Sequence, residues 1–358
     1  MALIQVEPET HMEREIFSQP ECWSECLGSL KTDPVLNAIE SGTDPDAEWL
    51  FVGCGTSYYL ALAAAASFSA ICGRQTRACP ASEVLLFPEI VTKRNQVAVL
   101  ISRSGRTTEA VKAMDLFRAH GEIKTITVTC SSDSAFAIRG DYPLVLARAN
   151  EQSTVMTRSF SSMLLGLQFL AARLAKKAEV SEQLGELPRL ARSLFASAPQ
   201  QVQEFVANHE FDDYVWLGQG PLYGVACEAA LKVMESSCSY AQSFHSLEFR
   251  HGPKAIAGPR ALVGFFISET GYSAEVDLLE EVKGLGSKTF VVSPRVDARV
   301  KASADILIEV PPLGMECARL AALIPWGQLL GLYTGLKKGL NPDSPRNLSQ
   351  VVILDEIS

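Results

Sequence analysis

Two glutamates and a lysine lie at helical spacing in the second half of the chain and could hold and move a proton. Glu228, Lys232 and Glu235 stand at i, i+4 and i+7, which places them on one face of a helix. Spacing alone favours a solvated Glu–Lys ladder. However, this helix corresponds by repeat to an Ala-rich, apolar stretch over residues 59–70, which indicates a buried helix.

A histidine-containing run follows closely after this helix. Phe244-His-Ser-Leu-Glu-Phe-Arg-His-Gly-Pro253 holds His245, His251 and Glu248. A carboxylate and a histidine near a phosphate pocket are suited to moving protons on a sugar carbon and a ring oxygen. As a metal site the run is weak, because it lacks the His-Glu-x-x-His spacing that puts both imidazoles on one helical face. We therefore expect neither a metal ion nor an organic cofactor.

Three polar loops carry hydrogen-bond donors that could bind an anion. They are Gly53-Cys-Gly-Thr-Ser57, Ser102-Arg-Ser-Gly-Arg-Thr-Thr108 and Ser153-Thr-Val-Met-Thr-Arg-Ser159. Hydroxyls, the backbone amides of a glycine turn and a helix N-terminus together form a phosphate cradle. Arg103, Arg106 and Arg158 would add charge and directed donors. Helix capping alone would explain any single loop, but three such loops favour an anion site.

Composition excludes several other functions. The 358 residues include 32 Lys and Arg against 41 Asp and Glu, a net charge of −9, which argues against binding to nucleic acid or to an anionic membrane. The nine scattered cysteines form no Cys-x-x-Cys pair, so they favour a reducing compartment. The apolar stretch from Tyr58 to Cys72 is too short to cross a bilayer. Gly53-x-Gly55 lacks the third glycine of a dinucleotide site. We expect a cytoplasmic protein.

The elements that would position these residues occur twice. Gly-x-Gly turns begin at Gly53 and Gly218, and each follows an apolar run and precedes a helical stretch. Three further pairs of apolar runs follow in the same order: 97–102 with 261–268, 124–129 with 288–293, and 142–146 with 305–310. Short strands alternating with helices indicate parallel sheets covered on both faces. We predict an α/β fold of two tandem flavodoxin-like subdomains, with one large doubly wound sheet as the less favoured alternative.

The predicted organisation has five parts. They are an N-terminal helical arm (1–44), a first subdomain with the phosphate loops (45–180), a linker (181–204), a second subdomain with the catalytic helix and histidine loop (205–345) and a C-terminal tail (346–358). In such sheets, ligands bind beyond the carboxyl ends of the strands. The polar loops of the first subdomain follow its strands, as an anion site at that edge requires.

In these motifs the chain resembles the sugar isomerase (SIS) family, specifically the isomerase half of glucosamine-6-phosphate synthase and SIS-type glucosamine-6-phosphate deaminases. The likeness covers nearly the whole chain and so also implies the two tandem SIS subdomains. It rests on Met12-Glu-Arg-Glu-Ile-Phe-Ser-Gln-Pro20, Cys54-Gly-Thr-Ser57, Ser102-x-Ser-Gly-x-Thr107, Glu228-x-Ala-Leu-Lys232-x-x-Glu235, Glu248-x-x-His-Gly-Pro253 and Pro345-Arg-Asn-Leu348.

The resemblance also implies roles for individual residues. A sugar 6-phosphate would be held by Thr56, Ser57, Ser102, Ser104 and Thr107, with Arg103 in the place of a family glutamine. Glu235 would move a proton between C1 and C2, Lys232 would lie near the sugar, and His251 would open the ring from the partner subunit of a homodimer. Further candidates for contact with the substrate are Cys54, Gly55, Arg158 and Glu248.

Two departures from the family pattern narrow the expected reaction. The synthase forms an imine through a lysine two residues after Arg-Asn-Leu, and here Gln350 occupies that position. A glutaminase domain is also expected to be absent. The sequence therefore favours an isomerase or deaminase acting on a hexosamine or hexose 6-phosphate. The alternatives are a fructosamine-6-phosphate deglycase and a non-catalytic sugar-phosphate sensor, and Glu235 with His251 favours an enzyme over the sensor.

Overall fold

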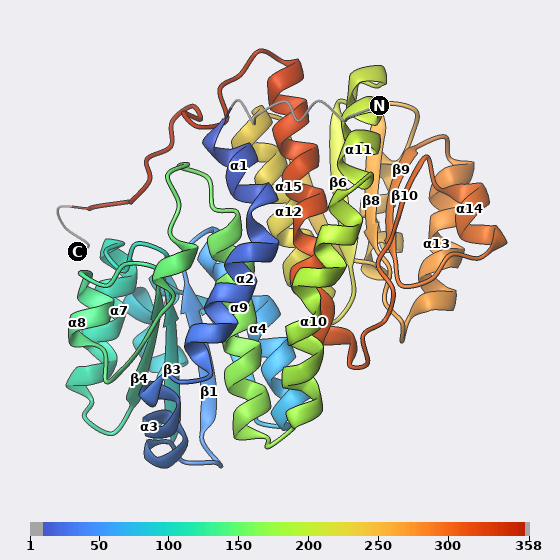
Figure 1. Ribbon diagram of the computed structural model, residues 1–358. Coiled ribbons are helices and arrows are strands. Elements are labelled where there is room, and N and C mark those ends of the chain that lie inside the picture. The colour runs from blue at the N-terminus through green and yellow to red at the C-terminus, as the bar shows by residue number, and fades with distance from the viewer. Residues whose placement is uncertain (1–9, 355–358) are drawn as a thin grey trace.

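The computed structural model describes residues 10–354, and it contains two parallel five-stranded sheets (Figure 1). The first has the order β2-β1-β3-β4-β5 and the second the order β7-β6-β8-β9-β10. The strands are β1 Glu48–Gly53, β2 Thr76–Pro80, β3 Gln96–Ile101, β4 Lys124–Thr129, β5 Tyr142–Val145, β6 Asp213–Gly218, β7 Ala241–His245, β8 Ala261–Phe266, β9 Lys288–Ser293 and β10 Ile306–Glu309. Both orders are those of a flavodoxin-like sheet. The prediction of two tandem subdomains is confirmed, and the single large sheet is wrong.

The same turn follows the first strand of each sheet. A Cβ atom at Gly53 would lie 2.4 Å from the Ser57 carbonyl oxygen, and one at Gly218 would lie 2.4 Å from the Leu222 carbonyl oxygen. Glycine is therefore required at both positions, because helix and strand approach too closely for a side chain. Gly55 and its counterpart Gly220 also share a positive φ, 54° and 55°. The duplication thus extends to backbone geometry.

Four long helices lie between the two sheets and share one core. They are α4 Thr56–Cys72, α9 Arg158–Leu174, α12 Leu222–Ser237 and α15 Leu320–Lys337 (Figure 1). A single hydrophobic cluster joins residues of both halves, among them Trp49, Phe68, Trp216 and Trp326. The apolar stretch 58–72 is a buried helix, as predicted. No helix within residues 10–354 is long and apolar enough to span a membrane.

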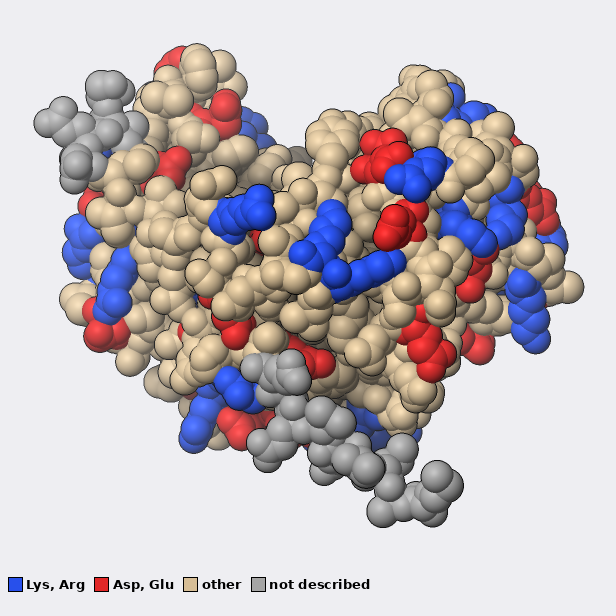
Figure 2. Space-filling view, turned by 90° about the horizontal axis from the view of Figure 1, so that it is seen from above, with Lys and Arg blue, Asp and Glu red and all other residues tan. Residues whose placement is uncertain are grey.

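Shorter helices cover the outer faces of the sheets. They are α5 Ala81–Leu86, α6 Pro88–Val91, α7 Thr108–Ala119 and α8 Ala135–Arg139 on the first sheet, and α13 Tyr272–Gly284 and α14 Ala298–Ser303 on the second. Each outer face has its own hydrophobic cluster, built around Phe117 in the first half and Phe265 in the second. On the face seen in Figure 2, acidic and basic side chains are interspersed.

The predicted linker is helical. α10 Ala178–Phe195 is followed by α11 Ala198–Asn208, and together they occupy nearly all of residues 181–204. Val180, Leu184 and Leu187 recur at helical spacing and are buried where α10 packs on α9 and on α2 of the N-terminal arm. The described part of the predicted arm consists of α1 His11–Phe17, α2 Gln19–Leu30 and α3 Pro34–Gly42, and residues 1–9 lie outside the described residues. The connection between the halves is thus part of the packed structure.

Helix α12 is held against α15 by a stripe of glycines. A Cβ atom at Gly327 would lie 2.4 Å from the Ala229 Cβ, one at Gly331 would lie 2.6 Å from the Lys232 carbonyl oxygen, and one at Gly335 would lie 2.1 Å from the Ser236 carbonyl oxygen. Only glycine allows the two backbones to approach this closely. The stripe therefore fixes the position of α12, which carries Glu228, Lys232 and Glu235.

Candidate active site

A cavity of about 210 Å³ lies beyond the carboxyl ends of β1 and β3. It is lined by Cys54, Gly55, Thr56, Ser57, Ser102, Arg103, Ser104, Thr107, Thr154, Met156, Glu235, Leu348, Ser349, Gln350 and Val352. All six residues predicted to bind the phosphate are in this lining, together with Cys54, Gly55 and Glu235. The structure thus brings together the three polar loops of the first half and one carboxylate of the second.

Two helices begin at this cavity without a side-chain cap. Gly55, which has no side chain, precedes α4, and Thr107, whose hydroxyl accepts no hydrogen bond from its own helix, precedes α7. The hydroxyl of Ser102 accepts from the Gly105 amide at 3.1 Å, and that of Ser104 accepts from the Arg106 amide at 3.2 Å, so both order the loop. Uncapped helix N-termini beside ordered hydroxyl groups suit an anion.

On α12, Glu228 and Lys232 are buried and Glu235 is partly buried. Lys232 is fully buried, Glu228 is 1% exposed and the side chain of Glu235 is 19% exposed. The Lys232 ammonium donates to Thr56 Oγ1 at 3.0 Å and to Glu235 Oε2, and it lies 3.3 Å from Glu228 Oε1. The solvated ladder that spacing alone favours is therefore wrong, because α12 packs between α4 and α15. Lys232 lies behind the cavity wall and is outside the lining.

Burial shifts the pKa values of Glu228 and Lys232 on α12. Burial raises the pKa of Glu228 to about 8, against the opposing effect of Lys232. Burial works against the charge of Lys232, but the carboxylates of Glu228 and Glu235 outweigh it and raise the Lys232 pKa. Both Glu228 oxygens lack a hydrogen-bond partner with good geometry. Burial therefore opposes the charge of Glu228, while Lys232 carries its charge beside Glu235.

Both cations nearest the cavity already have carboxylate partners. Arg103 lies 3.5 Å from Glu151 Oε2, and Lys232 pairs with Glu235. The predicted charge contribution of Arg158 is not found at the cavity, because its guanidinium donates to the Asn150 carbonyl and to Ser18 Oγ and is outside the lining. An anion here would therefore depend mainly on hydroxyl and amide donors.

The predicted residues of the histidine loop do not reach this cavity in the single chain. His251 and Glu248 are both exposed, and neither is in the lining. His245 stacks on Tyr223 with ring centroids 3.8 Å apart, and burial lowers its pKa. Within residues 10–354, no group of three or more His, Cys, Asp or Glu side chains is placed to hold a metal ion.

Several lining residues were not predicted to contact the substrate. Leu348, Ser349, Gln350 and Val352 come from the segment predicted to be a tail, and Thr154 and Met156 come from the third polar loop. The motif Pro345-Arg-Asn-Leu348 could have indicated that the C-terminal residues reach the cavity. A second missed residue is Glu15 of α1, whose buried carboxylate accepts from the Gln152 and Ser153 amides and so supports the third loop.

In the described part of the second half, the loop after β8 differs from its counterpart in the first half, although the fold is the same. The loop after β8 is the counterpart of the polar loop after β3, and there Glu275 takes the available donors. Its carboxylate accepts from the Ser268 amide at 2.7 Å, from the Ser268 hydroxyl at 2.6 Å and from the Ser246 hydroxyl at 2.6 Å. A protein carboxylate therefore fills this position, which leaves the first half to bind an anion.

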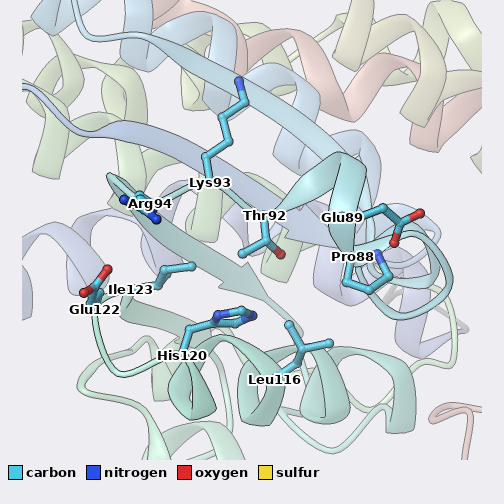
Figure 3. A pocket seen from close by; sticks show the side chains of 9 residues that line it. All are labelled: Pro88, Glu89, Thr92, Lys93, Arg94, Leu116, His120, Glu122 and Ile123. Carbon is cyan, nitrogen blue, oxygen red and sulfur yellow. The ribbon is translucent and has the colours of Figure 1, made fainter.

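A larger cavity of about 480 Å³ lies at the opposite, amino edge of the first sheet (Figure 3). It is lined by Pro88, Glu89, Thr92, Lys93, Arg94, Leu116, His120, Glu122 and Ile123. Charges of both signs are mixed in its wall, which contains no residue of α12 and none of the three polar loops. The smaller cavity contains Glu235 together with the polar loops, whereas the larger cavity contains none of them. The smaller cavity is therefore the candidate active site.

Comparison with known proteins agrees with this geometry. Residues 47–173 match the family described as the SIS domain. Glutamine–fructose-6-phosphate aminotransferase (isomerizing) of Pyrococcus horikoshii is 29% identical over 97% of this chain, which spans only 58% of that relative. A Streptomyces coelicolor protein named "Putative D-galactosamine-6-phosphate deaminase AgaS" is 29% identical over 94% of this chain and 91% of its own.

A solved structure is similar over its whole length. The crystal structure of glucosamine-6-phosphate deaminase from Thermotoga maritima is 29% identical to this chain, with a TM-score of 0.79 over 96% of this chain and all of that one. This similarity covers both halves of the duplicated fold.

Proposed function

Because the chain carries an SIS domain over residues 47–173, we propose that it is an enzyme that opens the ring of a hexosamine or hexose 6-phosphate and moves a proton between C1 and C2. The observation that carries the proposal is the presence of Glu235 in the same cavity as the three hydroxyl-rich loops. Those loops would bind the phosphate, and Glu235 would face the other end of the sugar. The names of the aminotransferase and deaminase relatives support this class of substrate.

Deamination is the reaction we favour. The open-chain aldehyde of a 2-amino sugar 6-phosphate would lose its C2 proton to the Glu235 carboxylate, and a C1–C2 enaminol would form as O1 takes a proton from water. Return of the C2 proton to C1, with loss of one proton from the nitrogen to water, gives an imine at C2. Water adds to this imine, ammonia leaves, and the product is a 2-ketose 6-phosphate. With a hydroxyl in place of the amine, the same transfer ends in aldose–ketose isomerisation.

Lys232 would orient the base in this scheme. Its ammonium donates to Glu235 Oε2 and to Thr56 Oγ1, and with Glu228 beside it the amine is fully surrounded. The lining of the cavity contains no lysine, and Gln350 donates from its side-chain amide to the Glu151 carbonyl at 3.3 Å. These contacts support a reaction that does not pass through an imine with the protein.

Ring opening is assigned to His251 of the partner subunit in a homodimer. Within one chain His251 is exposed and is outside the cavity lining, so a second copy would have to bring it to the sugar. A shared site of this kind requires a two-fold interface in which each chain contributes to both cavities.

Proton NMR in deuterium oxide, with ammonia assayed in parallel, tests the proposed function. The substrates are glucosamine 6-phosphate, fructose 6-phosphate, their galacto isomers and a fructosamine 6-phosphate. Deuterium at C1 or C2 with ammonia release supports a deaminase and identifies its sugar, while exchange without ammonia indicates an isomerase. Turnover of the fructosamine alone would indicate a deglycase, and saturable binding without exchange would indicate a sensor.

A further inference from the structure

The side chain of Arg103 connects three segments that are far apart in the sequence. It is 6% exposed and lies in the wall of the candidate active site. Nη1 donates to the Ser153 carbonyl at 3.0 Å, and Nη2 donates to the carbonyls of Thr154 and Gln350, both at 3.1 Å. The guanidinium thus joins the loop after β3, the loop before α9 and the C-terminal segment.

The charge of Arg103 is also matched within the protein. Glu151 Oε2 lies 3.5 Å from Nη1, and the Glu151 side chain is fully buried. Glu151 is held in turn by the amide and the hydroxyl of Thr157, which both donate to its Oε1 at 2.6 Å. With three carbonyl partners and one carboxylate, this guanidinium has little capacity left for a phosphate group.

The C-terminal segment is attached by few other contacts. The Gln350 side chain donates to the Glu151 carbonyl, the Thr108 amide donates to the Val352 carbonyl at 3.2 Å, and the Leu354 amide donates to Thr108 Oγ1 at 3.0 Å. Leu348 and Val352 are each 46% exposed, so apolar burial holds this segment only weakly. Figure 1 shows it leaving the end of α15 and running toward α7. A segment held this way depends on its polar contacts.

We propose that Arg103 is a positioning residue that holds the C-terminal segment, residues 348–352, over the phosphate cavity, and that it does not itself bind the phosphate. The same segment supplies Leu348, Ser349, Gln350 and Val352 to the cavity lining, so its release would remove one wall. The identity of the ligand rests on the proposed function. The contact between Arg103 and the segment exists in the free protein and can be measured without any ligand.

Hydrogen exchange of the amides of residues 350–354 in the full-length free protein tests this role. Arg103→Lys keeps a positive charge beside Glu151 but cannot reach three carbonyls at once. Thr108→Val independently removes the acceptor of the Leu354 amide. Exchange is expected to be roughly tenfold faster in each variant, because a contact to this segment is lost. The matched control is Arg106→Lys on the same loop, where Arg106 is exposed and pairs with Asp133, and no change in exchange is expected.

The dissociation constant for inorganic phosphate separates positioning from direct binding. If Arg103 acts through the segment, Arg103→Lys and Thr108→Val raise this constant by a similar factor, roughly three- to tenfold. The proposal would be overturned if Arg103→Lys left the exchange unchanged and raised the dissociation constant for phosphate while Thr108→Val did not raise it. That result would make Arg103 a phosphate ligand. Unchanged exchange in both variants would also overturn it, whatever substrate the enzyme uses.

Discussion

The Lys232 ammonium lies 3.0 Å from Thr56 Oγ1, so one buried hydrogen bond joins the helix that carries the candidate base to the first residue of the phosphate-loop helix. The two residues are 176 positions apart and belong to different halves of the duplicated fold. The carboxylate of Glu235 and the hydroxyl-rich loops therefore keep a fixed separation only if both halves stay packed. This contact explains why neither half alone contains a complete site.

Replacing Lys232 with methionine is expected to destabilise the protein. Methionine has a similar length but leaves Glu235 without its cation and Thr56 without a donor. Because one partner of a buried charge pair is removed, we expect the free energy of unfolding to fall by about 3–5 kcal/mol. Urea titration measures this change. Lys124→Met at the exposed start of β4 is the control and should stay within about 0.5 kcal/mol. Equal stability of both variants would show that the buried pair contributes nothing.

Glu235→Gln is expected to abolish turnover and to leave phosphosugar binding largely intact. The amide cannot accept the C2 proton but has nearly the same shape, and loss of a general base lowers kcat about 10²–10⁴-fold. Steady-state kinetics and calorimetric titration with the substrate measure the two effects. Glu186→Gln, an exposed carboxylate paired with Arg189, is the control. Loss of binding together with activity would contradict the role of Glu235 as a base.

Ser104→Ala is expected to act mainly on binding. Its hydroxyl lines the cavity, and removing one hydrogen bond to a charged phosphate should raise the dissociation constant roughly tenfold. The effect on kcat should be smaller. Ser131→Ala provides the control, because Ser131 lies outside the lining and its hydroxyl donates to Asp133. A loss of kcat with unchanged binding would count against Ser104 as a phosphate ligand.

Most of the fold could be predicted from the sequence because the central strands are rich in apolar and β-branched residues, as in β3 and β4. Two strands were missed, β2 Thr76–Pro80 and β7 Ala241–His245. Both lie at the edge of their sheets, where partial exposure permits polar residues and removes the apolar signal. Helix α10 was missed for a different reason, since its charged exposed face obscured the apolar face that packs on α2 and α9.

The candidate site was predictable where chain order alone brings residues together. The loops containing Thr56 and Ser102 follow neighbouring strands of one parallel sheet, so they had to meet at its carboxyl edge. The contacts of Arg103 were not predictable, because its partners are backbone carbonyls of segments 50 and 247 residues away. The burial of Lys232 likewise depends on how α12 packs against α4 and α15, which local spacing does not encode.

Glu228 is expected to make stability depend on pH. Burial raises its pKa to about 8 from an ordinary value near 4.5, so between these values the folded protein binds more protons than the unfolded chain. The contribution of Glu228 to stability is therefore complete below about pH 4.5 and is lost as the pH rises through about 8. Glu228→Gln stays neutral throughout, so its Tm relative to that of the unmodified protein should increase from pH 5 to pH 8. A constant difference between the two Tm curves would contradict a buried, protonated Glu228.

A shared active site predicts that two inactive variants restore each other. If His251 reaches the cavity of the partner subunit, Glu235→Gln and His251→Ala each inactivate both sites of their own homodimer. In a mixed dimer, one site combines Glu235 of the His251→Ala chain with His251 of the Glu235→Gln chain, so it is intact. Random assembly of an equal mixture should therefore recover about a quarter of the unmodified activity. Coexpression of the two variants with different tags, followed by tandem purification, isolates the mixed dimer, which should show about half of the unmodified activity because one of its two sites is intact. His251 is exposed and does not line the cavity of its own chain, so a catalytic role for it requires the partner subunit. No activity in the purified mixed dimer would mean that His251 does not act across the interface.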